Sequence, residues 1–178
     1  MLVRWADNSE MRSSELLTQR GALMKKFNRI LAPTDFSAYS DEGLRFAIDL
    51  AELFGSELTV LNVLRPDEIK QRQAMPLPSG YLDTIYRETK QKARDHFDEM
   101  MKERKHDLEV RFEVASGDPF VEIIRKAREQ QSDMIVLATH GRTGLKHVLL
   151  GSVAEKVVRS ADCPVLSIKP SGHKFELP

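Results

Sequence analysis

The sequence predicts an α/β fold with a single five-stranded parallel sheet and helices on both of its faces. Two observations predict it. Short apolar runs that are typical of buried strands occur along the chain, and segments whose apolar residues recur at helical spacing lie between them. Strands and helices that alternate in this way form a parallel sheet through right-handed crossovers, and the crossover helices cover both faces.

The five predicted strands differ in their apolar patterns. Runs 30–32 and 134–138 are wholly apolar, as in parallel strands that are buried on both faces. Over 108–114, apolar and charged residues alternate strictly, so one face contacts water and this strand suits an edge of the sheet. The other two strands are predicted over residues 58–64 and 164–169.

The first two predicted helices have clear periodicity. One covers residues 41–54 and stops at Gly55, since glycine is the usual residue beyond a helix C-terminus. The other covers residues 81–105 and has a buried stripe at helical spacing. That stripe consists of Leu82, Ile85, Thr89, Ala93, Phe97 and Met100.

The last two predicted helices are marked by their first residues. Asp118 is a candidate N-cap, and Pro119 occupies the first helical position, where its missing N–H costs nothing. A final helix covers residues 152–161. We expect its inner face to include Val153, Val157, Val158 and Ala161.

The length of 178 residues suits one domain, which we assign to residues 25–170. Residues 1–24 form a polar N-terminal extension of mixed charge, flexible or helical. This segment is either an upstream extension before a natural start at Met24 or a real helical arm. Residues 171–178 form a polar tail that we expect to be loose.

Composition excludes several classes of partner. Lysine plus arginine and aspartate plus glutamate both number 27, so no net positive charge draws the chain to nucleic acid or an anionic membrane. No apolar run is long enough to span a bilayer, and no secretory signal is visible. The single cysteine, Cys163, excludes an internal disulfide and fits a reducing compartment. We therefore expect a cytoplasmic protein without nucleic-acid or membrane partners.

A glycine-rich loop before the final helix carries the functional argument. Gly141, Gly144 and Gly151 let the backbone come close to a ligand, and the helix N-terminus that follows presents unpaired N–H groups. Together these features make an anion site for which phosphate is the usual ligand. Ser152 is predicted to be the N-cap and Glu155 to complete a capping box. Ser152 either only caps this helix or also contacts phosphate.

Other nucleotide and metal motifs are missing from the sequence. A Walker A loop needs a lysine before its final Ser or Thr, and no lysine precedes Ser152. No Gly-x-Gly-x-x-Gly follows the first strand, and no two histidines have the i, i+4 spacing of helical zinc ligands. His96 and His106 are expected to be solvated helix residues. His140 either touches the ligand or fixes the glycine loop.

The loop is similar to the nucleotide loop of the universal stress proteins, whose ATP-binding branch shows Gly-x2-Gly-x9-Gly-Ser/Thr. Gly141, Gly151 and Ser152 match this pattern, whereas Ala138 replaces the first glycine and makes positive φ costly there. Residues 25–170 resemble the family in register. The other matching segments are Pro33-Thr34-Asp35-Phe36-Ser37, Leu61-Asn62-Val63 and Cys163-Pro164-Val165-Leu166.

The resemblance implies the strand order 3-2-1-4-5 of the Rossmann-like, adenine nucleotide alpha hydrolase-like folds, with bound ATP. Asp35 would lie near the ribose and phosphates, and Val63 would meet the adenine. A Mg²⁺ or Mn²⁺ ion would accompany the triphosphate, held mainly by its oxygens. The full set of implied ligand-binding residues is Pro33, Thr34, Asp35, Val63, Ala138, Gly141, Gly151, Ser152, Val153 and Ala154.

By the same resemblance, the chain is a stress-response regulatory module that pairs as a homodimer through its C-terminal strand. We identify no catalytic residue, because no candidate base has an evident partner, so hydrolysis of ATP would at most be slow. An alternative remains open on the strength of Ala138. Some family members lack the glycine pattern and act as dimeric modules through protein partners without nucleotide.

Overall fold

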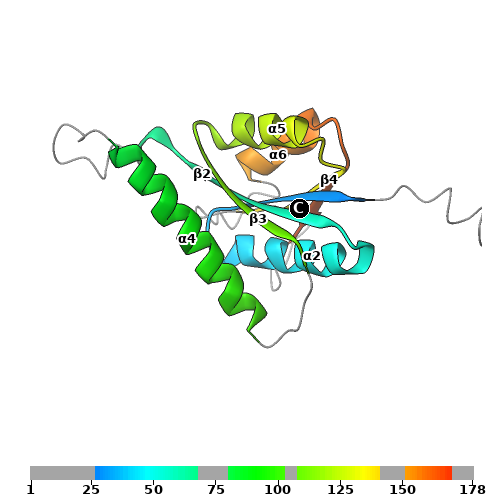
Figure 1. The fold of residues 1–178 in the computed structure, drawn as a ribbon. Helices are drawn as coiled ribbons and strands as arrows, with labels where there is room; N and C mark the ends of the chain where they lie inside the picture. The colour runs from blue at the N-terminus through cyan, green and yellow to red at the C-terminus, as the bar shows by residue number, and fades with distance from the viewer. Residues whose placement is uncertain (1–26, 68–79, 103–107, 141–150, 170–178) are drawn as a thin grey trace, which may run out of the picture.

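Five parallel strands form the central sheet, which confirms the predicted fold class (Figure 1). The computed structural model describes residues 27–67, 80–102, 108–140 and 151–169. The strands are β1 (Arg29–Thr34), β2 (Glu57–Leu64), β3 (Val110–Ser116), β4 (Met134–Ala138) and β5 (Val165–Ile168). Their spatial order is β3-β2-β1-β4-β5, so the predicted edge position of β3 and the predicted order are both confirmed.

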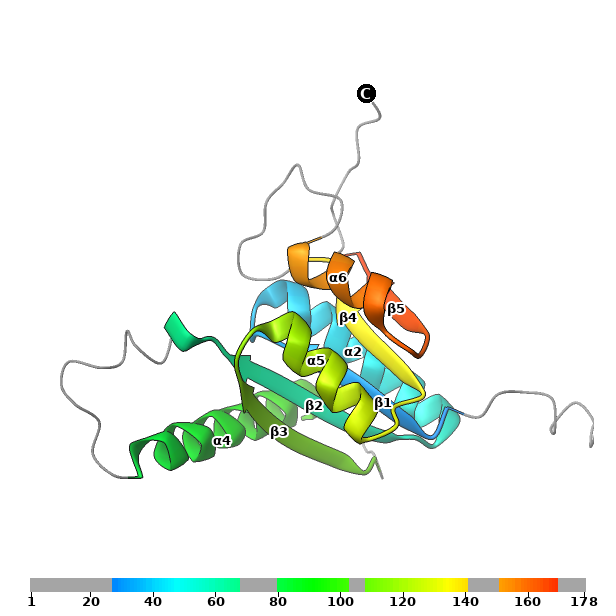
Figure 2. The same ribbon diagram turned by 90° about the horizontal axis from the view of Figure 1, so that it is seen from above.

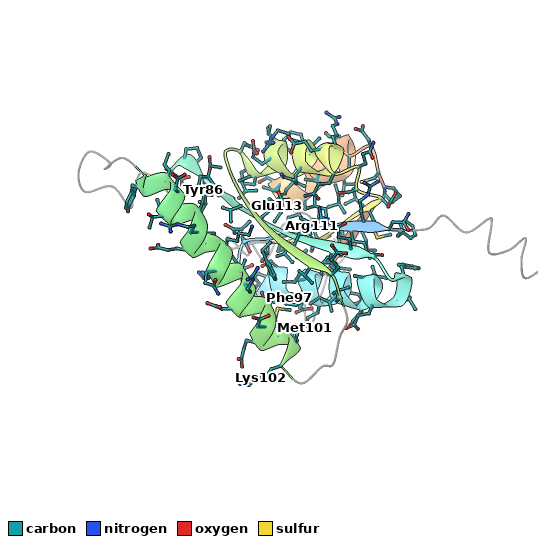
Figure 3. The ribbon with its side chains drawn as sticks, viewed as in Figure 1. Tyr86, Phe97, Met101, Lys102, Arg111 and Glu113 are labelled. Atoms are coloured by element: carbon teal, nitrogen blue, oxygen red, sulfur yellow. The ribbon has the colours of Figure 1, made fainter. Side chains whose placement is uncertain are left out.

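The four described helices cover the sheet in two pairs (Figures 1 and 2). Helices α2 (Ala38–Phe54) and α4 (Tyr81–Met101) lie on one face, and α5 (Pro119–Glu129) and α6 (Ser152–Ser160) lie on the other. Because neighbouring residues of a strand point to opposite faces, Ile30 packs in the core under α2 and α4. Leu31 packs in the core under α5 and α6. Figure 3 shows Phe97 and Met101 extending from α4 toward the sheet.

Local capping residues set the helix starts. The prediction that Asp118 caps α5 is confirmed, since its Oδ1 accepts hydrogen bonds from the backbone N–H groups of Phe120 (2.9 Å) and Val121 (3.3 Å). Helix α2 begins at Ala38, three residues before the predicted start. The reason is that Ser37 caps it, with Oγ accepting from the N–H of Ser40 at 3.2 Å.

Three predictions about helix faces are wrong. Leu82 is 44% exposed and Val158 is 45% exposed, although both were expected to face inward. Leu82 lies in the first turn of α4, and helical periodicity alone does not show how far the sheet extends beneath it. His96 is not simply solvated, because its Nε2 lies 2.7 Å from Asp41 Oδ1 on α2.

The strand order determines where a site can form. The carboxyl ends of parallel strands meet at one edge of a sheet, and the order reverses between β1 and β4. Helix α2 packs closely against the end of β4, because a Cβ at Gly43 would lie only 2.8 Å from the backbone nitrogen of Ala138. The ends of β1 and β4 are therefore held in place from the α2 side.

Several predictions lie outside the described residues. They concern the extension over 1–24, the predicted helical residues 103–105, His106 and the tail over 171–178. Within the described part of the chain, no helix combines the length and the apolar character that crossing a membrane requires.

Candidate functional site

A cavity of about 160 Å³ opens at the carboxyl ends of β1, β2 and β4, beside the N-termini of α5 and α6. The structure brings together nine of the ten predicted site residues in its lining. These are Pro33, Thr34, Asp35, Val63, Ala138, Gly151, Ser152, Val153 and Ala154. The tenth, Gly141, lies outside the described residues. Side chains from four separate segments thus converge where the topology predicts a ligand site.

The loop after β1 is fixed by short side-chain hydrogen bonds. Asp35 Oδ1 accepts from the N–H of Ser37 (3.1 Å) and from its Oγ (2.6 Å). Thr34 Oγ1 accepts from the N–H of Phe36 at 3.1 Å, and Phe36 itself has φ of 59°, in the left-handed region. Asn62 of β2 donates from Nδ2 to the carbonyl of Thr34 at 2.8 Å. Asp35 is therefore presented to the cavity by a defined turn.

Helix α6 begins differently from the prediction. Gly151 is the N-cap, with φ of −61° and ψ of 149°, and Ser152 is the first helical residue. The predicted capping box is wrong, since no side chain caps α6 among the described residues and Glu155 pairs instead with Arg159 (Oε1–Nη2 3.1 Å). The N–H of Gly151 donates to the carbonyl of Thr139 at 2.7 Å, which ties the helix start to the end of β4.

This arrangement leaves the start of α6 available to a ligand. The first N–H groups of a helix have no intrahelical acceptor, and here no side chain of the described residues takes them. Ser152, Val153 and Ala154 all line the cavity, and the Ser152 side chain is exposed. The positive end of the helix dipole therefore points to the cavity, which favours an anionic ligand group.

Ala138 does not carry the backbone penalty expected for it. It is the last residue of β4, pairs with Ile168 of β5 and has no positive φ. An extended strand residue tolerates a methyl group without strain, so the replacement of glycine here adds only the volume of one Cβ to the lining.

The cavity is also lined by residues that sequence reasoning missed. They are Ser40, Leu61, Arg65, Pro119, Ile123, Leu137 and Thr139. Leu61 and Arg65 flank the predicted Val63 near the end of β2, so a wider window around each strand end would have found them. Pro119 and Ile123 give no such signal, since only the packing of α5 over the sheet brings them here.

His140 follows β4 and is 6% exposed, and it lines the cavity while its Nδ1 lies 2.9 Å from Thr139 Oγ1. Both roles considered for it, contact with a ligand and fixing of the loop, are compatible with this position.

The lining has a polar side and an apolar side. Strand β2 and the start of α5 contribute the apolar residues Leu61, Val63, Pro119 and Ile123, with Arg65 directly after β2. The start of α6 contributes the uncapped amides. Strand β1 lies between β2 and β4, so Asp35 is central. The arrangement suits a ligand with an apolar part and an anionic part.

The clear pKa shifts in the described residues belong to ion pairs around α5 that do not line the cavity. A side-chain hydrogen bond to Glu113 raises the pKa of Lys126, whose Nζ lies 2.5 Å from Oε2. A hydrogen bond from Arg128 lowers the pKa of Asp162, with Nε 2.6 Å from Oδ2. These pairs connect α5 to β3 and to the segment before β5.

Comparison with known protein families shows to which family the chain belongs. The family model described as "Universal stress protein family" matches residues 26–169. The chain belongs to the universal stress protein family. Universal stress protein MJ0577 of Methanocaldococcus jannaschii is 33% identical over 154 residues, which covers 80% of this chain and 95% of that protein. Universal stress protein YxiE of Bacillus subtilis is 32% identical over 148 residues, covering 80% and 99%.

Solved structures of this family show the same fold. That of hypothetical protein MJ0577 has a TM-score of 0.66 at 28% identity, and covers 83% of this chain and 99% of that one. That of universal stress protein UspA from Lactobacillus plantarum has a TM-score of 0.59 at 25% identity, and covers 82% and 99%. The predicted family membership is thus confirmed.

Proposed function

We propose that this universal stress protein binds ATP in the cavity and acts as a stress-response regulatory module in the cytoplasm. The observation that carries the proposal is the uncapped N-terminus of α6, whose first residues Ser152, Val153 and Ala154 line the cavity. Backbone amides at a helix N-terminus, beside a loop rich in glycine, are a common phosphate site.

The two sides of the cavity support one orientation of the proposed nucleotide. The triphosphate would lie against α6 and Gly151, and the ribose near Asp35 and Ala138. The adenine would lie against Val63 and the apolar residues of β2 and α5. Asp35 is the acidic residue among the described lining residues, so a Mg²⁺ or Mn²⁺ ion would be held mainly by phosphate oxygens, which suits a hard cation.

Ligands of more distant family members are compatible with this proposal. One solved universal stress protein is in complex with cAMP, and another, from Archaeoglobus fulgidus, is in complex with dAMP. Their identities to this chain are 19% and 22%, so the likeness establishes the shared fold only. What these complexes add is that other proteins of this fold accept adenine nucleotides.

The first prediction is saturable binding of ATP. Titration calorimetry of purified protein with ATP and Mg²⁺ should give one nucleotide per chain, and GTP should bind more weakly if the apolar side selects adenine. Mass spectrometry of small molecules released from the purified protein checks the ligand independently. Absence of binding at millimolar ATP would favour the alternative, a dimeric module that acts through protein partners.

The second prediction is a homodimer through β5. This strand lies at the edge of the sheet and pairs only with β4 among the described strands, and Leu166 on it is 36% exposed. Unprotected apolar edges invite pairing with another chain. Light scattering after size exclusion should give twice the chain mass of 20.3 kDa, and Leu166→Lys should give monomer. Leu53→Lys, at a 74% exposed position on α2, is the matched control that should stay dimeric.

A further inference from the structure

The loop that carries Asp35 is in contact with α4, a helix that lies outside the cavity lining. Phe36 follows Asp35 directly, and its ring packs edge-on against His96 of α4, with ring centroids 5.9 Å apart and planes at 77°. Lys92 Nζ lies 4.8 Å from the centroid of the same ring. Two residues one helical turn apart on α4 thus hold the ring next to the site.

The backbone of Phe36 needs this support. Its φ of 59° lies in the left-handed region, which residues with a side chain rarely adopt because Cβ crowds the carbonyl oxygen. Strained residues of this kind persist when the surrounding structure holds them. If Phe36 left this conformation, the hydrogen bonds from Ser37 to Asp35 Oδ1 would be displaced, and Asp35 with them.

His96 also contacts α2, the helix that follows the loop. Its Nε2 lies 2.7 Å from Oδ1 of Asp41 in the first turn of α2, with the two side chains 32% and 23% exposed. Asp41 is the group in direct contact with the imidazole.

We propose that His96 and Lys92 are positioning residues for the nucleotide site, and that they act on Asp35 through Phe36 and Asp41. This inference rests on the proposed function and adds supporting residues to its site. Lys92 and His96 contact the Phe36 ring, and His96 also contacts Asp41 in the first turn of α2. These contacts hold the loop between β1 and α2 in the conformation that presents Asp35. Without them the loop can leave its strained conformation, so ATP affinity falls.

The test compares wild type with His96→Ala, which loses both contacts, and with His96→Gln, which keeps a hydrogen-bonding group. The measured quantity is the affinity of each protein for ATP under the same conditions. We expect a loss of about fivefold in His96→Ala, at the lower end of typical coupling, and partial recovery in His96→Gln. Thermal melting checks that each variant is folded at the temperature of the titration. An unchanged ATP affinity in folded His96→Ala overturns the proposal.

Two further variants separate positioning from general stability. Phe36→Gly accepts φ of 59° but lacks the ring, so it should bind ATP more weakly than wild type even if it folds as stably. Asp95→Asn is the matched control on α4, since this exposed residue bonds Gln91 and not the loop, and it should behave as wild type. Equal ATP affinity in Phe36→Gly and wild type would contradict the proposed route.

A measurement without nucleotide distinguishes failure of this inference from failure of the proposed function. The N–H groups of Phe36 and Ser37 donate within the loop, so their hydrogen exchange reports its order. Without nucleotide, exchange at both should be faster in His96→Ala than in wild type. If ATP does not bind wild type, the proposed function fails and exchange alone decides the coupling. Unchanged exchange overturns the coupling.

Discussion

Gly151→Val should lower the affinity for ATP by at least tenfold, or about 1.4 kcal/mol, while the protein stays folded. A Cβ at Gly151 would lie 3.0 Å from the carbonyl oxygen of Thr139, the same oxygen that accepts the Gly151 N–H at 2.7 Å. Valine adds two further methyl groups, so the start of α6 must move away from β4. The uncapped amides then lose their alignment with the cavity. The double variant Gly141→Val with Gly151→Val should abolish binding.

Calorimetric titration with ATP measures the effect, and circular dichroism with thermal melting checks the fold. Gly151→Ala is the graded control, because it adds the same Cβ without the branch and should lie between wild type and the valine variant. The position has φ of −61°, so neither side chain strains the backbone itself. An unchanged ATP affinity in folded Gly151→Val would refute the assignment of the phosphates to α6.

Phe97→Ala should cost about 4 kcal/mol of unfolding free energy, the usual range for a buried phenylalanine. The Phe97 side chain is 2% exposed and lies in the core between α4 and the sheet, where Figure 3 shows it. Its ring also packs edge-on against Phe112 of β3, with centroids 5.6 Å apart. Because β3 is an edge strand, α4 supplies much of its cover on this face. The melting temperature should fall by about 10 °C.

Urea unfolding followed by far-ultraviolet circular dichroism gives the free energy. The matched control is Phe46→Ala, the same chemical change on α2 at a side chain that is 50% exposed. Exposed positions away from special features change stability by about 0.5 kcal/mol or less. If the two variants were equally stable, Phe97 would not contribute to the core as its burial indicates.

Local sequence signals predicted most elements because they act over a few residues. The wholly apolar run over 134–138 gave β4 with its observed bounds, and strict alternation over 108–114 identified an edge strand. Asp118 and Pro119 marked the start of α5 correctly. These signals depend on periods of two or 3.6 residues and on caps, which are properties of the segment itself.

The site was predicted in part, because the resemblance to the family implied ten ligand-binding residues. Nine of them line one cavity. Pro119, Ile123 and His96 were missed or misread, because their neighbours are distant in sequence. His96, for example, meets Asp41 across 55 residues of chain, and no local pattern encodes that pairing.

By itself, the sequence determined the element types, the family and the loops where a ligand site should lie. Only the tertiary structure decided that Gly151 rather than Ser152 caps α6, because the N–H of Gly151 is taken by the end of β4. It also decided that Ala138 stays extended, since β5 pairs with it. Both outcomes depend on hydrogen bonds between segments that become neighbours only once the sheet has formed.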